Sequence, residues 1–336
     1  MKSAGLANDK LMGRPHVYIL GAGASYAAFP RGEKTGRKLP LMNNLVEILQ
    51  LSGLLELHGV KYGGENFETL YSELNGNPEK ADLLAQLEES IRAYFGEMML
   101  PDEPTLYDHL VLSLREKDVV ATFNWDPFLW QACARNSQEA GVPCPLFLHG
   151  NVAVGYCLEH KQKGPTGGTC TVCGRPYQSS RLLFPVAQKN YSADPFISAE
   201  WKTLRDALKD GFILTIFGYG APSSDVEAVD LMKTAWDGPA SRQFEEVEIV
   251  DIKSVPELTK TWSPFIFSHH YTTGASFYSS ISAQHPRRSC EATWDRLMAC
   301  QFLESTPIPI DKSFDGLYEW LWPLINFERQ SERANP

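Results

Sequence analysis

Two pairs of metal-binding side chains lie close together in the middle of the 336-residue chain. The four members of the pattern are Cys157, His160, Cys170 and Cys173. Two short loops that each donate two sulfur or nitrogen ligands are typical of a tetrahedral zinc site. Because protein atoms fill all four positions, the spacing predicts a structural Zn²⁺ rather than a catalytic one. The alternative is a set of free cysteines beside an unrelated histidine.

A glycine-rich turn follows a short apolar run, residues 16–20, which predicts a buried strand. The turn consists of Gly21, Ala22, Gly23, Ala24 and Ser25. Its two glycines would let the backbone approach a pyrophosphate, and the helix that follows would supply amide donors. Tyr26 stands where the dinucleotide fingerprint has its third glycine, which excludes the ordinary dehydrogenase motif. A plain strand-to-helix turn is the alternative.

A carboxamide and a carboxylate, Asn124 and Asp126, follow the apolar run 118–123. They would lie at the strand ends, where open α/β sheets bind ligands. Asn124 can donate and accept, as recognition of a carboxamide requires, and Asp126 can hold a water molecule. Phe123 and Trp125 would form apolar walls. The alternative is that Asn124 and Asp126 cap the next helix.

His149 follows a third short strand, predicted over residues 146–149. Its imidazole suits a general base near neutral pH, although seven further histidines share that property. A second glycine-containing loop, residues 217–225, follows the apolar run 212–217 and precedes a helix predicted over 226–236. In it, Gly218 permits close backbone approach, while Ser223 either caps the helix or offers its hydroxyl to a ligand.

These segments must be positioned by strands and helices that alternate along the chain. Strands at 118–123, 146–149, 212–217 and 247–252, with helical segments between several of them, predict an α/β fold. We expect a Rossmann-like parallel sheet with helices on both faces. The predicted catalytic domain comprises residues 14–58, 106–154 and 182–330. A helical insertion (59–105) and a zinc-binding insertion (155–181) interrupt it, and helices are expected over 41–57, 78–99 and from Asp311 onward.

Composition narrows the class of protein. Hydrophobic residues make up 43% and charged residues 21%, as in folded soluble proteins. The net charge of -10 disfavours direct nucleic-acid binding. No apolar run is long enough for a membrane helix, and residues 1–15 lack the apolar core of a signal peptide, so we expect a cytoplasmic protein without membrane contact. Seven cysteines in such a chain favour a metal site or free thiols over a disulfide framework.

The order of these motifs over residues 16–252 resembles the sirtuin family. The resemblance implies that NAD⁺ is the substrate and that the glycine turn holds it. Asn124 and Asp126 would meet the nicotinamide end, and His149 would be the base. The resemblance also implies which residues face the phosphates and the adenosine ribose: Gly218, Tyr219, Ser223, Asp225 and Asp251.

The chain departs from deacylating sirtuins at several points. Those enzymes carry Gln where Phe123 stands, and a Phe-Gly-Glu segment after the zinc knot where residues 183–189 have none. Their Asp-Phe-Arg after the glycine turn is only faintly echoed by residues 29–31. The zinc site here has one His for Cys and a shorter span. Together these departures look like the divergent sirtuin-like proteins of bacterial anti-phage systems, which cleave NAD⁺ without an acyl-lysine acceptor.

The hypothesis from the sequence is therefore an NAD⁺ glycohydrolase that releases nicotinamide and ADP-ribose. The chain has no room for a separate sensor domain of ordinary size, so control is expected from self-assembly into a homo-oligomer or from an activating partner protein. Two alternatives remain, because fold alone does not fix function. One is an NAD⁺-dependent protein deacylase, and the other is a catalytically silent module that binds NAD⁺ or ADP-ribose.

Overall fold

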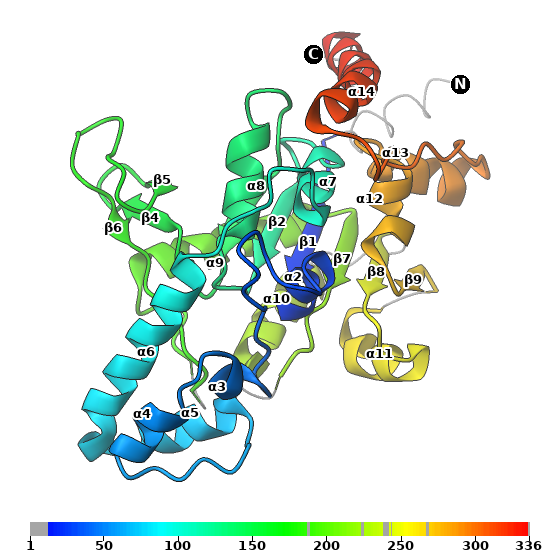
Figure 1. Ribbon diagram of the computed structural model, residues 1–336. Coiled ribbons are helices and arrows are strands. Elements are labelled where there is room, and N and C mark those ends of the chain that lie inside the picture. The colour runs from blue at the N-terminus through cyan, green and yellow to red at the C-terminus, as the bar shows by residue number, and fades with distance from the viewer. Residues whose placement is uncertain are drawn as a thin grey trace.

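A six-stranded, all-parallel sheet forms the centre of the molecule (Figure 1). The computed structural model describes residues 13–186, 189–222, 225–237, 242, 244–266 and 269–334. In sheet order the strands are β3 (Cys144–Phe147), β2 (Val119–Thr122), β1 (His16–Leu20), β7 (Ile213–Phe217), β8 (Glu246–Val250) and β9 (Tyr271–Gly274). The predicted parallel sheet is confirmed, and β9 is a strand that the sequence did not predict.

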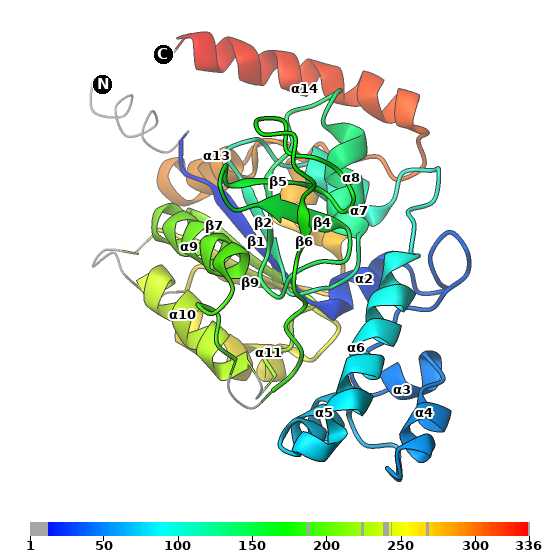
Figure 2. The ribbon, with the colours of Figure 1, turned by 90° about the vertical axis from the view of Figure 1, so that its left-hand side faces the viewer.

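Helices cover both faces of this sheet, as predicted. One face carries α9 (Pro195–Asp210) and α10 (Val226–Asp237), which lie side by side in Figure 2. The other face carries α7 (Leu106–Leu112), α12 (Ile281–Gln284) and α13 (Ser289–Trp294). Alternate residues of β1 point to this second face, since His16 bonds to Ser289 of α13 and Tyr18 to Ser282 of α12. The sheet is therefore buried on both sides, which explains its nearly continuous apolar strands.

Three shorter helices follow the carboxyl ends of strands β1, β2 and β8. They are α2 (Ala22–Ala28), α8 (Phe128–Asn136) and α11 (Val255–Trp262). The C-terminal helix α14 (Phe314–Ala334) lies across one end of the molecule (Figure 2). It buries Leu317, Leu321 and Ile325, and it confirms the helix predicted from Asp311 onward. No helix among the described residues is long and apolar enough to cross a membrane.

A helical lobe projects from the body beside the glycine turn (Figures 1 and 2). It contains α3 (Leu45–Ile48), α4 (Ser52–Leu57), α5 (Phe67–Asn75) and α6 (Ala81–Gly96), with a 3₁₀ turn at Pro78–Lys80. The prediction of one helix over 41–57 is wrong. The chain breaks at Gln50, whose φ of 55° ends the first helix and turns the chain so that Leu51 and Leu55 are buried.

The predicted zinc-binding insertion is a separate small sheet that stands away from the body (Figure 1). Its antiparallel strands are β4 (Val154–Cys157), β5 (Gln162–Pro165) and β6 (Gln178–Ser179), in the order β5-β4-β6. Strands of two to four residues with so few aliphatic side chains cannot bury a core of their own. The insertion therefore needs a stabilising cross-link in addition to hydrophobic packing.

Candidate active site

The two glycine-containing loops meet at the carboxyl ends of the neighbouring strands β1 and β7. The Gly21 N–H donates to the Phe217 carbonyl oxygen (3.0 Å), and the Gly23 N–H donates to the Gly218 carbonyl oxygen (2.9 Å). A Cβ on Gly21 would stand 2.5 Å from the Tyr219 Cα, which leaves room only for hydrogen at that position. Gly218 also has a φ of +62°. These glycines are therefore required by the close approach of the two loops, while Ala22 is exposed.

Three predicted residues form one buried hydrogen-bonded group at this edge. Asn124 Nδ2 donates to the Gly21 carbonyl oxygen and to Ser25 Oγ, both at 2.9 Å. Ser25 Oγ donates its only proton to Asp126 Oδ2 at 2.6 Å. The Tyr107 hydroxyl, 2.7 Å from Ser25 Oγ, must therefore act as a donor to it. Tyr107 comes from α7 and was not predicted, because nothing near it in the sequence marks it.

Burial changes the acid–base chemistry of Asp126. The carboxyl is 4% exposed. Loss of solvent raises its pKa to about 6, although the Ser25 hydroxyl and the Phe128 N–H favour the charged form. Asp126 thus titrates close to physiological pH, unlike an ordinary aspartate.

The predicted base, His149, lies just beyond the end of β3 and is 5% exposed. Its Nε2 is 3.3 Å from the Tyr191 hydroxyl and 3.7 Å from Asp225 Oδ1. Burial, together with the positive charge of Lys189, lowers its pKa to about 3, against the opposing effect of Asp225. The imidazole is therefore neutral at physiological pH. Tyr191 and Lys189 were not predicted.

Aromatic rings form the apolar wall beside His149. The Phe123 ring stacks on the Tyr219 ring with centroids 4.1 Å apart and an interplanar angle of 5°. The Phe123 ring also meets the His149 ring at 4.8 Å, edge to face. Trp125 packs instead against Phe184, 4.9 Å away between ring centroids. Phe123 therefore bridges His149 and the second glycine loop, and its role as an apolar wall of a ligand site stays a prediction.

Two of the predicted cofactor-binding residues, Ser223 and Asp251, are not part of the cluster described above. Ser223 lies outside the described residues. Asp251 follows β8, where its Oδ1 accepts from the Lys253 N–H at 3.0 Å and its own N–H donates to the Gly274 carbonyl oxygen at 2.9 Å. The remaining predicted residues of the second loop, Tyr219 and Asp225, join the His149 cluster through a 2.9 Å hydrogen bond from the Tyr219 hydroxyl to Asp225 Oδ2.

The four predicted metal ligands converge in the small insertion. Their ligand atoms all lie within 4.8 Å of one another. Cys157 Sγ is 3.5 Å from His160 Nδ1 and 3.9 Å from Cys173 Sγ, and Cys170 Sγ is 3.7 Å from His160 Nδ1. Ligands at zinc–sulfur and zinc–nitrogen bond lengths in a tetrahedron stand roughly 3.5 to 3.8 Å apart. The donor set and its spacing therefore fit a four-coordinate zinc ion.

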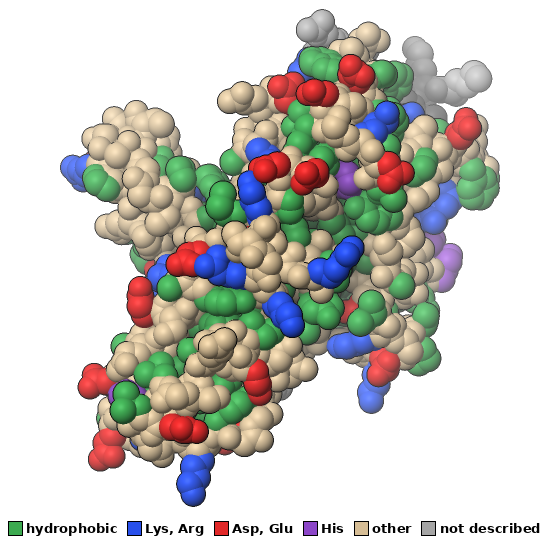
Figure 3. Space-filling view, viewed as in Figure 1, with side chains coloured by type: hydrophobic (Ala, Val, Ile, Leu, Met, Phe, Trp, Pro, Cys, Tyr) green, Lys and Arg blue, Asp and Glu red, His purple; other side chains and the backbone are tan. Residues whose placement is uncertain are grey.

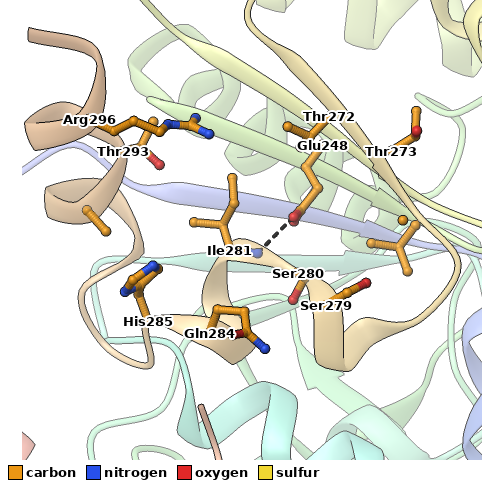
Figure 4. A pocket seen from close by; sticks show the side chains of 13 residues that line it. Glu248, Thr272, Thr273, Ser279, Ser280, Ile281, Gln284, His285, Thr293 and Arg296 are labelled. Carbon is orange, nitrogen blue, oxygen red and sulfur yellow. Dashed lines mark hydrogen bonds between the residues drawn. The ribbon is translucent and has the colours of Figure 1, made fainter. Parts of the chain in front are cut away.

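A cavity of about 250 Å³ lies between β8 and β9 and the helices α12 and α13 (Figure 4). Glu248 faces it, and Glu248 Oε1 accepts from the Ile281 N–H at 2.8 Å. Burial raises the pKa of Glu248 to about 7. His285 and Arg296 line the opposite side. None of the predicted site residues lines this cavity, so it is separate from the cluster around His149.

No family model and no curated protein matches this chain. Solved structures of Sir2 enzymes are similar to it in fold. One, from a study of the mechanism and regulation of Sir2 enzymes, is 15% identical and covers 87% of this chain and 97% of its own, with a TM-score of 0.39. A complex of a Sir2 homologue with NAD is 12% identical, covers 87% and 94%, and has a TM-score of 0.38.

A variant of a Sir2 homologue with ADP-ribose is 11% identical to this chain, covers 88% of it and 99% of its own length, and has a TM-score of 0.40. Identities and TM-scores this low do not identify the family of the chain. The case for its function rests on the residues of its own site.

Proposed function

We propose that this protein is a sirtuin-like NAD⁺ glycohydrolase. The observation that carries the proposal is that Asn124 and Asp126, after β2, bond to the glycine turn, while His149 follows the neighbouring strand β3 at the same edge of the sheet. These residues occur in the sequence order in which sirtuin motifs occur. A carboxamide, a carboxylate of raised pKa and a neutral imidazole in one desolvated place suit the cleavage of a charged glycoside.

The reaction needs positioning more than a strong nucleophile. The bond between nicotinamide and ribose C1′ breaks, and its electron pair leaves with nicotinamide, which becomes neutral. Water attacks the oxocarbenium-like carbon and loses a proton, so that NAD⁺ and water give nicotinamide, ADP-ribose and H⁺. Asn124 binds the nicotinamide carboxamide or fixes the water, and Asp126 orients that water or Asn124. His149 acts as base on a ribose hydroxyl.

We propose hydrolysis rather than acyl transfer, because the chain lacks features that binding of an acyl-lysine peptide would need. Phe123 replaces the glutamine of deacylating sirtuins, and its ring is occupied by stacking against Tyr219. Residues 183–189 lack the segment that pairs with such a peptide in those enzymes. Zn²⁺ in the insertion would be structural, since four protein ligands leave no open position.

The resemblance to anti-phage proteins supports a role in defence by NAD⁺ depletion, in the cytoplasm and without direct contact to nucleic acid or membrane. Such an activity must be restrained until it is needed. We therefore expect activity to depend on a homo-oligomer or an activating partner protein. A full rate from dilute monomer would contradict this expectation.

The test is NAD⁺ consumption in ¹⁸O-labelled water, with and without an acetyl-lysine peptide. The glycohydrolase consumes NAD⁺ without peptide and places ¹⁸O on the ribose C1 of ADP-ribose. Consumption only with peptide, accompanied by O-acetyl-ADP-ribose, would instead establish the deacylase. Binding of ADP-ribose in calorimetry without any turnover would favour the silent binding module.

A further inference from the structure

Several described groups that would meet a dinucleotide are engaged within the chain. The Gly23 N–H, a candidate phosphate donor, is taken by the Gly218 carbonyl oxygen at 2.9 Å. Asn124 donates both amide protons, one to the Gly21 carbonyl oxygen and one to Ser25 Oγ. Tyr219 is 5% exposed: its Cα and Cβ lie against Gly21, and its ring stacks on Phe123. Substrate therefore reaches the glycine turn only if the Gly218–Tyr219 backbone moves away.

A buried ion pair holds that backbone in place. Lys189 Nζ forms an ion pair with Asp225 Oδ1, and the two residues are 6% and 3% exposed. The other oxygen, Asp225 Oδ2, accepts from the Tyr219 hydroxyl at 2.9 Å. Burial alone would raise the pKa of Asp225, but the Lys189 ammonium and the hydrogen bond from Tyr219 hold it below its usual value, so the carboxylate stays charged. One carboxylate thus connects Lys189, which follows the zinc-binding insertion, to Tyr219, whose backbone lies against the glycine turn.

Such a contact can be separated only when its charges find other partners. A buried charge left alone is strongly unfavourable, so the pair stays closed in the absence of a competing ion. A bound dinucleotide offsets the cost of separating the pair through the contacts that it gains at the glycine turn. Opening of the site is therefore favoured by the same kind of ligand that it would admit.

We propose that Lys189 is a positioning residue, which holds Tyr219 over the glycine turn through Asp225 and so keeps the nucleotide site closed. The identity of the ligand rests on the proposed function, whereas the closing contact rests on the geometry of Lys189, Asp225 and Tyr219. The contact reduces the fraction of molecules that can bind, and the apparent affinity falls by that fraction.

The test compares four substitutions by calorimetry with ADP-ribose and by hydrogen exchange of peptides that cover residues 20–28 and 213–222. Lys189→Met removes the ammonium but keeps the chain length, and Lys189→Arg keeps the charge. Tyr219→Phe removes only the hydroxyl that bonds to Asp225. Lys163→Met breaks the Lys163–Glu200 pair, which lies away from this contact and serves as the matched control.

We expect Lys189→Met to bind ADP-ribose about tenfold more tightly or better, because removing the closed state removes its cost in affinity. Its two peptides should exchange faster. Tyr219→Phe should show a smaller gain in the same direction, and Lys189→Arg and Lys163→Met should match the wild type. Tyr219→Phe keeps the test valid if Lys189→Met does not fold, since it leaves the buried charges paired.

Unchanged exchange and unchanged or weaker binding in both Lys189→Met and Tyr219→Phe would overturn the proposal. The failure of the proposed function looks different: no variant binds ADP-ribose, yet the Lys189→Met peptides still exchange faster. That result would uphold the closing contact and reject the nucleotide as its ligand.

Discussion

The zinc-binding insertion and the cluster around His149 are built in opposite ways. The insertion brings four ligands together from residues 157–173, within a segment that has no core of its own. The His149 cluster takes its side chains from six separate segments between Gly21 and Asp225 and buries them almost completely. The ligands of a site made from one short segment can be predicted from their spacing in the sequence, and the stability of that segment depends on its metal. A site made from many segments depends on the whole sheet and on contacts that spacing does not reveal.

The largest effect is expected from removing a zinc ligand. Cys170→Ser should lower the zinc content from about one ion per chain to near none, because three ligands hold the ion far less tightly than four. Structural zinc contributes on the order of 10 kcal/mol of apparent binding free energy, so residues 155–181 should lose their hydrogen-exchange protection. Metal analysis and exchange check this, with the exposed Cys300→Ser as control.

In the same variant, the peptides of the large sheet should keep their protection, since Tyr156 is the one buried hydrophobic residue that the insertion contributes to the main core. Loss of protection throughout β1, β2 and β7 would show that the two regions fold as one unit. Zinc retained at full stoichiometry in Cys170→Ser would contradict the assignment of the ligands.

A change in pH should affect turnover through Asp126 in the buried cluster. As pH falls through about 6, Asp126 gains a proton and no longer accepts as a carboxylate, so kcat/KM should fall about tenfold per pH unit below that value. His149, with a pKa of about 3, should add no further limb between pH 5 and pH 8. The acidic limb should disappear in Asp126→Asn, whatever the residual rate. A limb that persists there would assign the titration to another group.

The smallest effect is expected at the margin of the site. Asp251 is half-buried and has no contact with Asn124 or His149. Loss of one hydrogen bond to the ribose should raise KM for NAD⁺ by about threefold to tenfold in Asp251→Asn, while kcat stays unchanged. Steady-state kinetics beside the exposed Asp82→Asn variant measure this. An unchanged KM would remove Asp251 from the site.

The difference between the two regions also explains what the sequence could predict. The four metal ligands, the strand ends and the burial of α6 follow from local spacing and apolar periodicity. The sequence did not predict strand β9, because its residues, Tyr-Thr-Thr-Gly, are half-exposed at the sheet edge and form no apolar run. The sequence did not predict the break between α3 and α4 at Gln50, because a periodic apolar pattern continues across it.

The contacts around His149 could not be predicted from the sequence for a different reason. Lys189, Tyr191 and Tyr107 reach the site only through the pairing of distant segments, and each looks like an ordinary surface or core residue in the sequence. A lysine that is 6% exposed owes its burial to Asp225, 36 positions away along the chain. Only the assembled sheet brings such partners together.

The most direct test of the central claim is NAD⁺ turnover by Asn124→Ala and His149→Ala, across a protein concentration series and without peptide. Both should be made in the wild-type and the Lys189→Met backgrounds, so that a closed site does not conceal activity. The exposed Asn75→Ala and the peripheral His58→Ala serve as matched controls. We predict turnover in at least one background, reduced about 10²- to 10³-fold by each site substitution in protein that remains folded. Turnover unaffected by both substitutions, or none in either background at any concentration, would contradict the account.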